Sequence, residues 1–452
     1  MTVLWAKQAL TGAGWRSDVR VEIGSGGVIE CLVADSPPDG ARHAILLPAP
    51  TNLHSHAFQR AMAGLTEHRG PDPQDSFWTW RALMYKFLDQ LTPDDVEAIA
   101  ALVQMEMLEA GYGAVCEFHY LHHQPSGKPF DAIAEMSERI VAATSETGIG
   151  LTLLPVLYRH GGCDRRPLGA GQVRFGCTLE QFQNLKAGAE KALGYLPSDA
   201  QIGIAPHSLR AVAPDDLAEV VALAGDCPVH MHLAEQTAEV AEVQAHLRAR
   251  PAEWLFANTD VGDRWCLIHC TQLEPHEISA LAASGAVVGL CPITEANLGD
   301  GIFDGVRFVR AGGAFGVGSD SNIRISLSEE LRSLEYSQRL RDRGRAMLAN
   351  TGRSTGRLLF ETAAMSGARA AGRPSGVLQE GALADLVALD GDALAVAGKS
   401  GDGVLDGYIF AGDDHDARCL VRGPSRRERG VISGTTLLYS VMVRDLPVCA
   451  RL

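Results

Sequence analysis

Short apolar runs alternate with longer amphipathic segments through most of the chain. The runs with the pattern of buried strands are residues 46–53, 113–118, 150–157, 202–205, 229–233, 266–270, 286–291 and 314–320. The segments with the apolar spacing of helices include residues 93–110, 131–147, 179–193, 214–225, 236–248 and 275–284. Eight strands that alternate with helices predict an α/β fold, a (β/α)8 TIM-like barrel. A doubly wound sheet is the alternative.

The two ends of the chain have a different pattern, in which short strands lie between turns. Candidate strands are residues 18–23, 28–33, 381–390 and 417–423. Residues 1–48 are too few to build a hydrophobic core by themselves. We therefore expect residues 1–48 and 372–452 to form a small β-sandwich domain beside a barrel of residues 49–371.

Composition narrows the class of partner. Lys and Arg number 40 against 55 Asp and Glu, and this balance argues against nucleic acid or an anionic membrane as the main partner. No run of 18 apolar residues is present, and residues 1–7 lack the basic start and apolar run of a signal peptide. Ten cysteines without a C-x-x-C pair argue against a disulfide framework. We expect a cytoplasmic protein.

Chemically active side chains follow four of the eight predicted strands. His54 and His56 stand at the exit of the first strand, His232 at the fifth, His269 at the sixth and Asp320 at the eighth. Side chains two residues apart in a strand point to the same side. The active site of a barrel lies at the C-terminal ends of its strands, so we expect these five side chains to converge.

A convergent set of this kind predicts one divalent metal ion. The side chains that would hold it are His54, His56, His232 and Asp320. Nitrogen and oxygen ligands suit Zn²⁺ first, and ligand type alone leaves Fe²⁺ and Mn²⁺ open. Zinc lowers the pKa of a bound water to about 7, which provides hydroxide at neutral pH. Glu235 and His269 are the available proton carriers.

Other candidate ligands nearby have simpler interpretations. His230 shares a strand face with His232 but lies deeper, so we expect a hydrogen-bonded core histidine. Cys266 and Cys270 flank His269, and no second cysteine pair completes a set of four thiolates. We expect two buried thiols.

Several motifs resemble the amidohydrolase superfamily, and within it the deaminases that hold one metal ion. These are Pro50-x-Asn52-x-His54-x-His56, His232-Leu-Ala-Glu235, the lone His269 and Ser319-Asp320. Longer segments are similar to the formimidoylglutamate deiminase family, namely residues 52–64, 76–81, 117–123, 206–210, 291–303 and 329–336. The chain departs from the family around residues 161–174, and it has Asn322 where histidine is expected.

The resemblance implies hydrolysis of N-formimino-L-glutamate to N-formyl-L-glutamate and ammonia, a step of histidine degradation. Hydroxide held by the metal would attack the formimino carbon. Glu235 would protonate the imino nitrogen and then the leaving ammonia, while His269 and Asp320 would orient and deprotonate the water. The resemblance also implies a homodimer.

A substrate with two carboxylates requires cations and hydrogen-bond donors in the pocket. Arginine suits this best, because its guanidinium group can donate two parallel hydrogen bonds to one carboxylate. The contacts implied by the resemblance are Gln59, Arg81, Tyr120, His207 and Arg210. The competing arginines are Arg60, Arg165 and Arg174. Trp78 and Trp80 are expected to pack in a lid or wall.

Two other functions stay open at this point. A deaminase of a heterocyclic base such as guanine, an adenosine-like nucleoside or a triazine could use the same metal site, with an aromatic pocket and no need for two arginines. A barrel kept as a metal-free binding or scaffold protein would be expected to lose its ligand histidines, and none is lost here.

Overall fold

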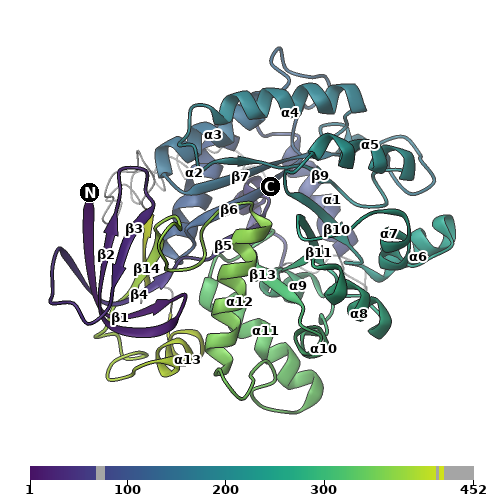
Figure 1. Ribbon diagram of the computed structural model, residues 1–452. Helices are drawn as coiled ribbons and strands as arrows, with labels where there is room; N and C mark the ends of the chain where they lie inside the picture. Colours follow the sequence, from purple (N-terminus) through teal and green to yellow (C-terminus); the bar gives the residue numbers. More distant parts are fainter. Residues whose placement is uncertain (68–76, 414–416, 422–452) are drawn as a thin grey trace.

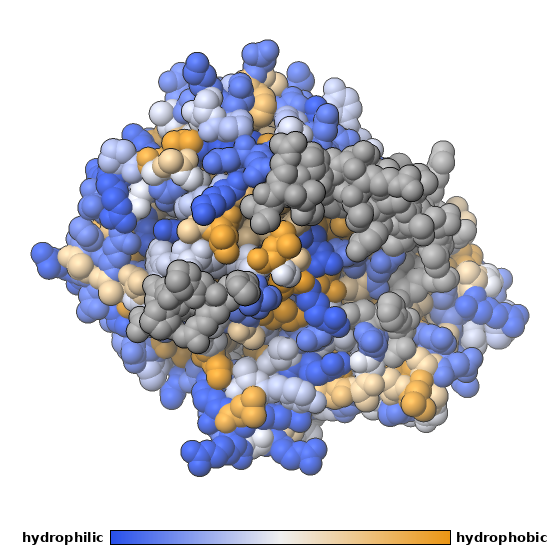
Figure 2. All heavy atoms as spheres, turned by 180° about the vertical axis from the view of Figure 1, so that it is seen from behind, coloured by the Kyte–Doolittle hydropathy of each residue, from blue (hydrophilic) through white to orange (hydrophobic). Residues whose placement is uncertain are grey.

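The computed structural model describes residues 1–67, 77–413 and 417–421. It has a barrel of parallel strands surrounded by helices, with a second sheet beside it (Figure 1). The opposite face of the molecule is largely hydrophilic, with a group of apolar side chains near its centre (Figure 2). Among the described residues, no helix is long and apolar enough to cross a membrane.

Strands at eight positions form the barrel. They are β5 (Thr51–Ser55), β6 (Ala114–His119), β7 (Gly150–Leu157), the short pieces β8 (Gln201–Ile202) and β9 (Ala205–Pro206), β10 (Val229–Leu233), β11 (Trp265–His269), β12 (Val287–Leu290) and β13 (Ala314–Val317). Two parallel bridges, Ser55 with Asp320 and Ile204 with Val229, join the two halves into a closed ring. The prediction of a TIM-like barrel is confirmed, and the doubly wound alternative is wrong.

The helices lie outside this ring (Figure 1). They are α1 (Phe77–Leu88), α2 (Pro93–Glu109), α3 (Glu135–Thr147), α4 (Leu179–Leu193), α5 (Pro214–Ala224), α6 (Thr237–Leu247), α7 (Pro251–Asn258), α8 (Pro275–Ser284), α9 (Pro292–Leu298), α10 (Gly305–Arg310), α11 (Leu327–Asp342), α12 (Thr355–Ala370) and α13 (Asp402–Ala411). Thr92 and Thr178 begin α2 and α4 with side-chain caps that accept from backbone N–H groups. The six helices predicted from apolar spacing are all present.

The second sheet gathers strands from both ends of the chain. Its order is β15 (Ala417–Val421), β14 (Asp385–Leu389), β4 (Ala41–Pro48), β1 (Thr2–Thr11), β2 (Gly14–Ile23) and β3 (Ile29–Val33). Leu4, Val21, Leu46 and Leu386 pack into a small core of their own on this sheet. The predicted sandwich form of this unit stays a prediction, and residues 422–452 of it lie outside the described residues.

The prediction of one strand over residues 46–53 is wrong. The chain there forms the end of β4 and then the start of β5, which belong to different sheets. The N–H of Ala49 donates to the carbonyl of Asp385 in β14, whereas the carbonyl of Pro50 accepts from Gly113 beside the barrel. Pro48 and Pro50 have no N–H to offer a ladder, so pairing changes partner between them.

Arg373 joins the barrel to the second sheet. Its Nη2 lies 2.8 Å from carboxylate oxygens of both Asp199 and Asp385, and its Nη1 donates to the Asp199 carbonyl at 2.7 Å. The Arg373 side chain is fully buried. Removing one member of such a buried ion group lowers the stability of the fold, because the remaining charges stay buried without a partner.

Replacing Arg373 by methionine is expected to lower the stability of the fold by about 3–5 kcal/mol. Urea unfolding followed by circular dichroism would measure the change as a lower midpoint. The matched control is Arg139→Met, which removes a surface ion-pair cluster and should cost about 1 kcal/mol or less. Equal midpoints for the two variants would contradict this role of Arg373.

Candidate active site

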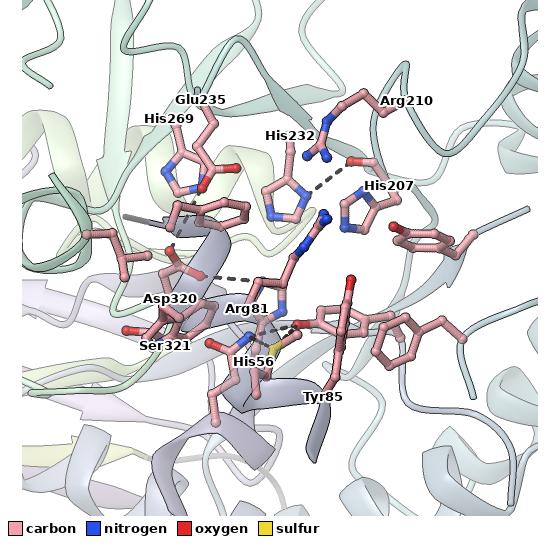
Figure 3. A pocket seen from close by; sticks show the side chains of 18 residues that line it. His56, Arg81, Tyr85, His207, Arg210, His232, Glu235, His269, Asp320 and Ser321 are labelled. Carbon is pink, nitrogen blue, oxygen red and sulfur yellow. Dashed lines mark hydrogen bonds and ion pairs between the residues drawn. The ribbon is translucent and has the colours of Figure 1, made fainter. Parts of the chain in front are cut away.

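The side chains predicted to converge do meet at the C-terminal ends of the barrel strands (Figure 3). His54 lies in β5, His232 in β10 and His269 at the end of β11. His56 and Asp320 follow β5 and β13, and their backbones are paired there, since the N–H of His56 donates to the carbonyl of Asp320. All five residues are buried.

Three imidazoles in this cluster present nitrogen atoms to a common point. The Nε2 atoms of His54 and His232 are 3.0 Å apart. His56 donates from Nδ1 to the carbonyl of Phe118 at 2.9 Å, and His232 donates from Nδ1 to the carbonyl of His207 at 3.1 Å. These bonds fix the tautomers, so the Nε2 lone pairs of His56 and His232 face the cluster.

Asp320 supplies the oxygen atoms of the cluster. Its Oδ1 lies 3.5 Å from Nε2 of His54 and 3.4 Å from Nε2 of His56. Its Oδ2 lies 3.9 Å from Nε2 of His269. Burial raises the pKa of Asp320 to about 7, and His269 acts in the opposite direction.

The cluster fits a divalent metal ion in its chemistry and its spacing. Ligand atoms about 2.0–2.1 Å from a tetrahedral zinc are roughly 3.3 Å apart, and the observed separations of 3.0, 3.4 and 3.5 Å lie around that value. Burial lowers the pKa of His56 to about 3 and holds the pKa of His54 and His232 well below the usual value. Neutral imidazoles beside a carboxylate form a set of lone pairs that a cation would stabilise.

His269 differs from the other histidines in its surroundings. Its Nδ1 lies 3.3 Å from Oε1 of Glu295, a residue of α9. Burial opposes a charge on His269, but Glu235, Glu295 and Asp320 outweigh burial and raise its pKa to about 10. The three carboxylates around His269 thus favour the protonated form of its imidazole.

A buried amide network fixes the backbone that carries the cluster. Asn52 donates to Oγ of Ser319 at 2.6 Å, and the same hydroxyl donates to Oδ1 of Asn322 at 2.6 Å. Asn322 in turn donates to the carbonyls of His56 and Asp320 at 3.2 and 3.1 Å. Asn322 thus provides an amide that binds the two backbone carbonyls beside the cluster.

Glu235 lies in the turn between β10 and α6 and lines the pocket. Ala234, the residue before it, has a backbone φ of +50°, a value that residues other than glycine rarely adopt. The carboxylate of Glu239 accepts from the N–H groups of Ala234 and Glu235 at 3.2 and 2.9 Å. Glu239 therefore stabilises the strained turn that presents Glu235 to the pocket.

The other side of the pocket is cationic and aromatic (Figure 3). Arg81 and Arg210 both line it, and their Cζ atoms lie 4.4 and 5.5 Å from the ring centre of Trp78. Gln59 donates to the hydroxyl of Tyr120 at 2.7 Å. All five predicted substrate contacts, including His207, line this one pocket. Trp78 packs against both guanidinium groups, as the wall prediction expects, and Trp80 lines the pocket.

The competing arginines are engaged elsewhere. Arg60 pairs with Glu106 at 2.7 Å, and Arg165 lies at the surface with Asp215. Arg174 is buried and donates to three backbone carbonyls, those of Leu88, Leu91 and His123. These contacts leave Arg81 and Arg210 as the arginines of the pocket.

The core interpretations of the neighbouring candidates are confirmed. His230 is fully buried and donates from Nε2 to the carbonyl of Ala370 at 2.9 Å. Cys266 and Cys270 are buried free thiols, and burial holds the pKa of both well above the usual value.

Sequence reasoning missed several residues of the pocket. They are Phe77, Met84, Tyr85, Tyr158, Phe175, Leu298 and Ser321. Tyr158 directly follows β7, so its place at a strand exit was the available signal. Ser321 directly follows Asp320, so its place in the sequence was an equally good signal. No pattern in the chain relates Tyr85 of α1 to β7, because that contact depends on how α1 packs across the barrel mouth.

Comparison with known proteins agrees with this geometry. The amidohydrolase family profile matches residues 45–414, and the profile of the formimidoylglutamate deiminase HutF N-terminal domain matches residues 1–44. A protein named formimidoylglutamate deiminase from Pseudomonas aeruginosa is 48% identical over 426 residues, which cover 92% of each chain.

The chain belongs to the formimidoylglutamate deiminases of the amidohydrolase family. The resemblance inferred from its motifs is confirmed. Membership makes it a metabolic hydrolase of the deiminase class, and the interpretation as a metal-free scaffold protein loses its support.

Solved structures agree on the fold. An amidohydrolase from Brucella melitensis superposes with a TM-score of 0.92 at 46% identity, covering 98% of both chains. A zinc-bound adenosine deaminase from Xanthomonas campestris superposes with a TM-score of 0.77 at 21% identity, covering 98% of both chains. The second likeness carries the fold alone. The His and Asp cluster of this chain supports metal binding.

Proposed function

We propose that this chain hydrolyses N-formimino-L-glutamate to N-formyl-L-glutamate and ammonia in histidine degradation. The observation that carries the proposal is a single pocket with a His and Asp cluster on one side and two arginines on the other. A substrate with an amidine-like carbon and two carboxylates matches both sides. Family membership supports the same reaction.

One divalent ion, zinc, would be held by His54, His56, His232 and Asp320. When bound there, zinc supplies Lewis acidity that lowers the pKa of a water molecule to about 7. The carbonyls of Phe118 and His207 keep the ligand nitrogens of His56 and His232 aimed at the ion.

His269 and Asp320 orient the attacking water. The protonated imidazole of His269 donates toward its oxygen, and the Asp320 carboxylate accepts its proton. Glu295 holds His269 in place through Nδ1. The nucleophile then faces the formimino carbon on the side of the pocket where these two residues lie (Figure 3).

Glu235 moves the proton that expels ammonia. Its carboxyl group first gives a proton to the imino nitrogen and then takes the remaining hydroxyl proton of the tetrahedral adduct, while the proton that Asp320 accepted from the water returns to Glu235 at the end of the cycle. A second transfer to the same nitrogen converts it to a leaving ammonia as the carbon–nitrogen bond breaks. The turn that Glu239 stabilises holds Glu235 beside His269 for both transfers.

The carboxylates of the substrate would be bound by the cationic side of the pocket. Arg81 and Arg210 supply charge, and Gln59, Tyr120 and His207 supply hydrogen bonds. Trp78 restrains both guanidinium groups, which lowers the entropy that they lose when a carboxylate binds.

Three features of the whole protein are proposed on family resemblance. The chain would be a homodimer located in the cytoplasm. Residues 1–48 and 372–452 would form one small β-sandwich domain, and residues 49–371 the catalytic barrel. Shared strands in one sheet support the pairing of the two chain ends.

Turnover of candidate substrates tests the reaction. Ammonia release should be rapid with N-formimino-L-glutamate and absent with guanine, adenosine and cytosine, because those rings place no carboxylates near Arg81 and Arg210. A coupled glutamate dehydrogenase assay measures ammonia. Release from a heterocycle alone would overturn the proposal in favour of a base deaminase, which the aromatic wall could also accommodate.

A further inference from the structure

Two tyrosine hydroxyl groups lie at the cationic side of the pocket and have no part in the mechanism above. Tyr85 belongs to α1 and Tyr158 follows β7, and both line the pocket with Arg81 and Arg210. Figure 3 places Tyr85 across the pocket from His269 and Asp320. The guanidinium of Arg81 lies 5.6 Å from the ring centre of Tyr85.

A single buried amide controls the direction of both hydroxyl groups. Gln172 lies in η2 (Ala170–Gln172), and its Oε1 accepts from the N–H of Gly169 at 2.9 Å. Its Nε2 is therefore the only polar atom left, and it donates to the hydroxyl oxygen of Tyr158 at 2.8 Å. Burial raises the pKa of Tyr85 to about 12, and the neighbouring Gln172 side chain acts in the opposite direction.

An oxygen that accepts from an amide still has its own hydrogen to donate. Each tyrosine has one O–H donor, and among the described residues no acceptor binds the hydroxyl hydrogen of Tyr85 or Tyr158. The hydroxyl groups therefore donate toward the pocket, in the same sense as the guanidinium groups of Arg81 and Arg210.

The backbone of η2 packs directly on Tyr85. A Cβ atom at Gly171 would lie 2.3 Å from Cγ of Tyr85, so only glycine permits this approach. The contact restrains the Tyr85 ring beside Gln172, independently of the hydrogen bonds.

We propose that Gln172 is a positioning residue that makes this end of the pocket a donor-only site for the side-chain carboxylate of the substrate, and that this arrangement excludes a carboxamide at the same position. The inference rests on the proposed function, because it concerns the same substrate. Of the two substrate carboxylates, the side-chain group is the farther from the formimino carbon, so it reaches the end of the pocket away from His269 and Asp320.

The hydrogen-bond donors at this end of the pocket disfavour a carboxamide. A carboxylate accepts from Tyr85, Tyr158 and the arginines without conflict. A carboxamide of the same shape brings an NH2 group that needs an acceptor. The Oε1 atom of Gln172 is already bound to Gly169, so an NH2 group placed beside Tyr85 and Tyr158 would compete with the hydroxyl and guanidinium donors there.

The test compares N-formimino-L-glutamate with N-formimino-L-glutamine, its side-chain amide, on the zinc-loaded enzyme. Wild-type kcat/KM should favour the acid by roughly 100-fold or more. Tyr158→Phe should raise KM for the acid by about 10- to 100-fold with little change in kcat, because one hydrogen bond to a charged group is lost far from the reacting carbon.

Gln172→Glu provides the sharper variant. A carboxylate at position 172 can still accept from Gly169, but it turns the tyrosine hydroxyl hydrogens toward itself and leaves oxygen lone pairs facing the pocket. KM for the acid should rise at least about tenfold, and the preference for the acid over the amide should fall by a similar factor. The kcat value and the zinc content should stay close to wild type.

The matched control is Gln181→Glu. Gln181 accepts from the N–H of Thr178 at the start of α4, as Gln172 accepts from Gly169, but it does not line the pocket. This control should leave KM and the acid preference unchanged. The inference is overturned if Tyr158→Phe and Gln172→Glu both keep KM and the acid preference within about twofold of wild type. If wild type itself does not turn over the acid, the proposed function fails instead.

Discussion

Removal of the bound metal is expected to abolish ammonia release, and one equivalent of Zn²⁺ per chain should restore it. In the buried cluster of proposed ligands, the nitrogen of His54 lies 3.0 Å from that of His232, and Asp320 lies 3.5 and 3.4 Å from His54 and His56. Zinc held there would lower the pKa of a water molecule to about 7, and its loss would remove hydroxide at neutral pH. The measurement is activity after dialysis against a chelator, with metal content determined by plasma mass spectrometry before and after reconstitution.

A ligand variant and a neighbour separate metal loss from general damage. His232→Ala should lose zinc and activity together, and added zinc should not restore either. His230→Ala removes a buried histidine from the same strand without removing a ligand, so it should retain stoichiometric zinc. Full activity in protein without stoichiometric metal would contradict the assignment. Reconstitution with Fe²⁺ and Mn²⁺ would rank the native metal.

Replacing Glu235 by glutamine is expected to lower kcat by about 10²–10⁴-fold while zinc stays bound. Glutamine has nearly the same shape and can keep the contacts of the turn, but it cannot carry a proton between water and the imino nitrogen. Glu235 is not among the four proposed ligands, so the metal content should not change. Steady-state kinetics and metal analysis on the same preparation give both quantities.

The control for Glu235→Gln is Glu253→Gln, which removes a carboxylate from a surface pair with His276. Its kcat should equal that of wild type. A variant at Glu239 would test the turn rather than the chemistry, because its carboxylate binds the backbone of Ala234 and Glu235. A fully active Glu235→Gln enzyme would remove the proton-shuttle role.

Most residues of the metal cluster could be predicted from the sequence because they stand at the ends of predicted strands. His54 and His56 are two residues apart at the end of a predicted strand, and extended backbone there points both side chains to one side. His232, His269 and Asp320 each follow a predicted strand, so a barrel brings them to one end. The structure places all of these residues together, although their roles as ligands and proton carriers stay predictions.

Other features depended on contacts between distant segments. The single strand expected over residues 46–53 divides because Ala49 pairs with β14 and Pro50 with Gly113, and neither partner is visible in the local pattern. Glu295 meets His269 only because β11 and β12 are neighbours, which brings α9 to the cluster.

The sequence by itself determined the alternation of strands and helices, the family and the set of ligand candidates. These properties depend on periodicity and on residue types at strand ends, which are local. Tertiary structure decided which arginines face the pocket, where Asn322 and Glu295 bind, and how Gln172 directs two tyrosine hydroxyl groups. Hydrogen-bond direction in a buried site depends on which partners packing supplies, and those partners here lie up to 267 residues apart in the chain.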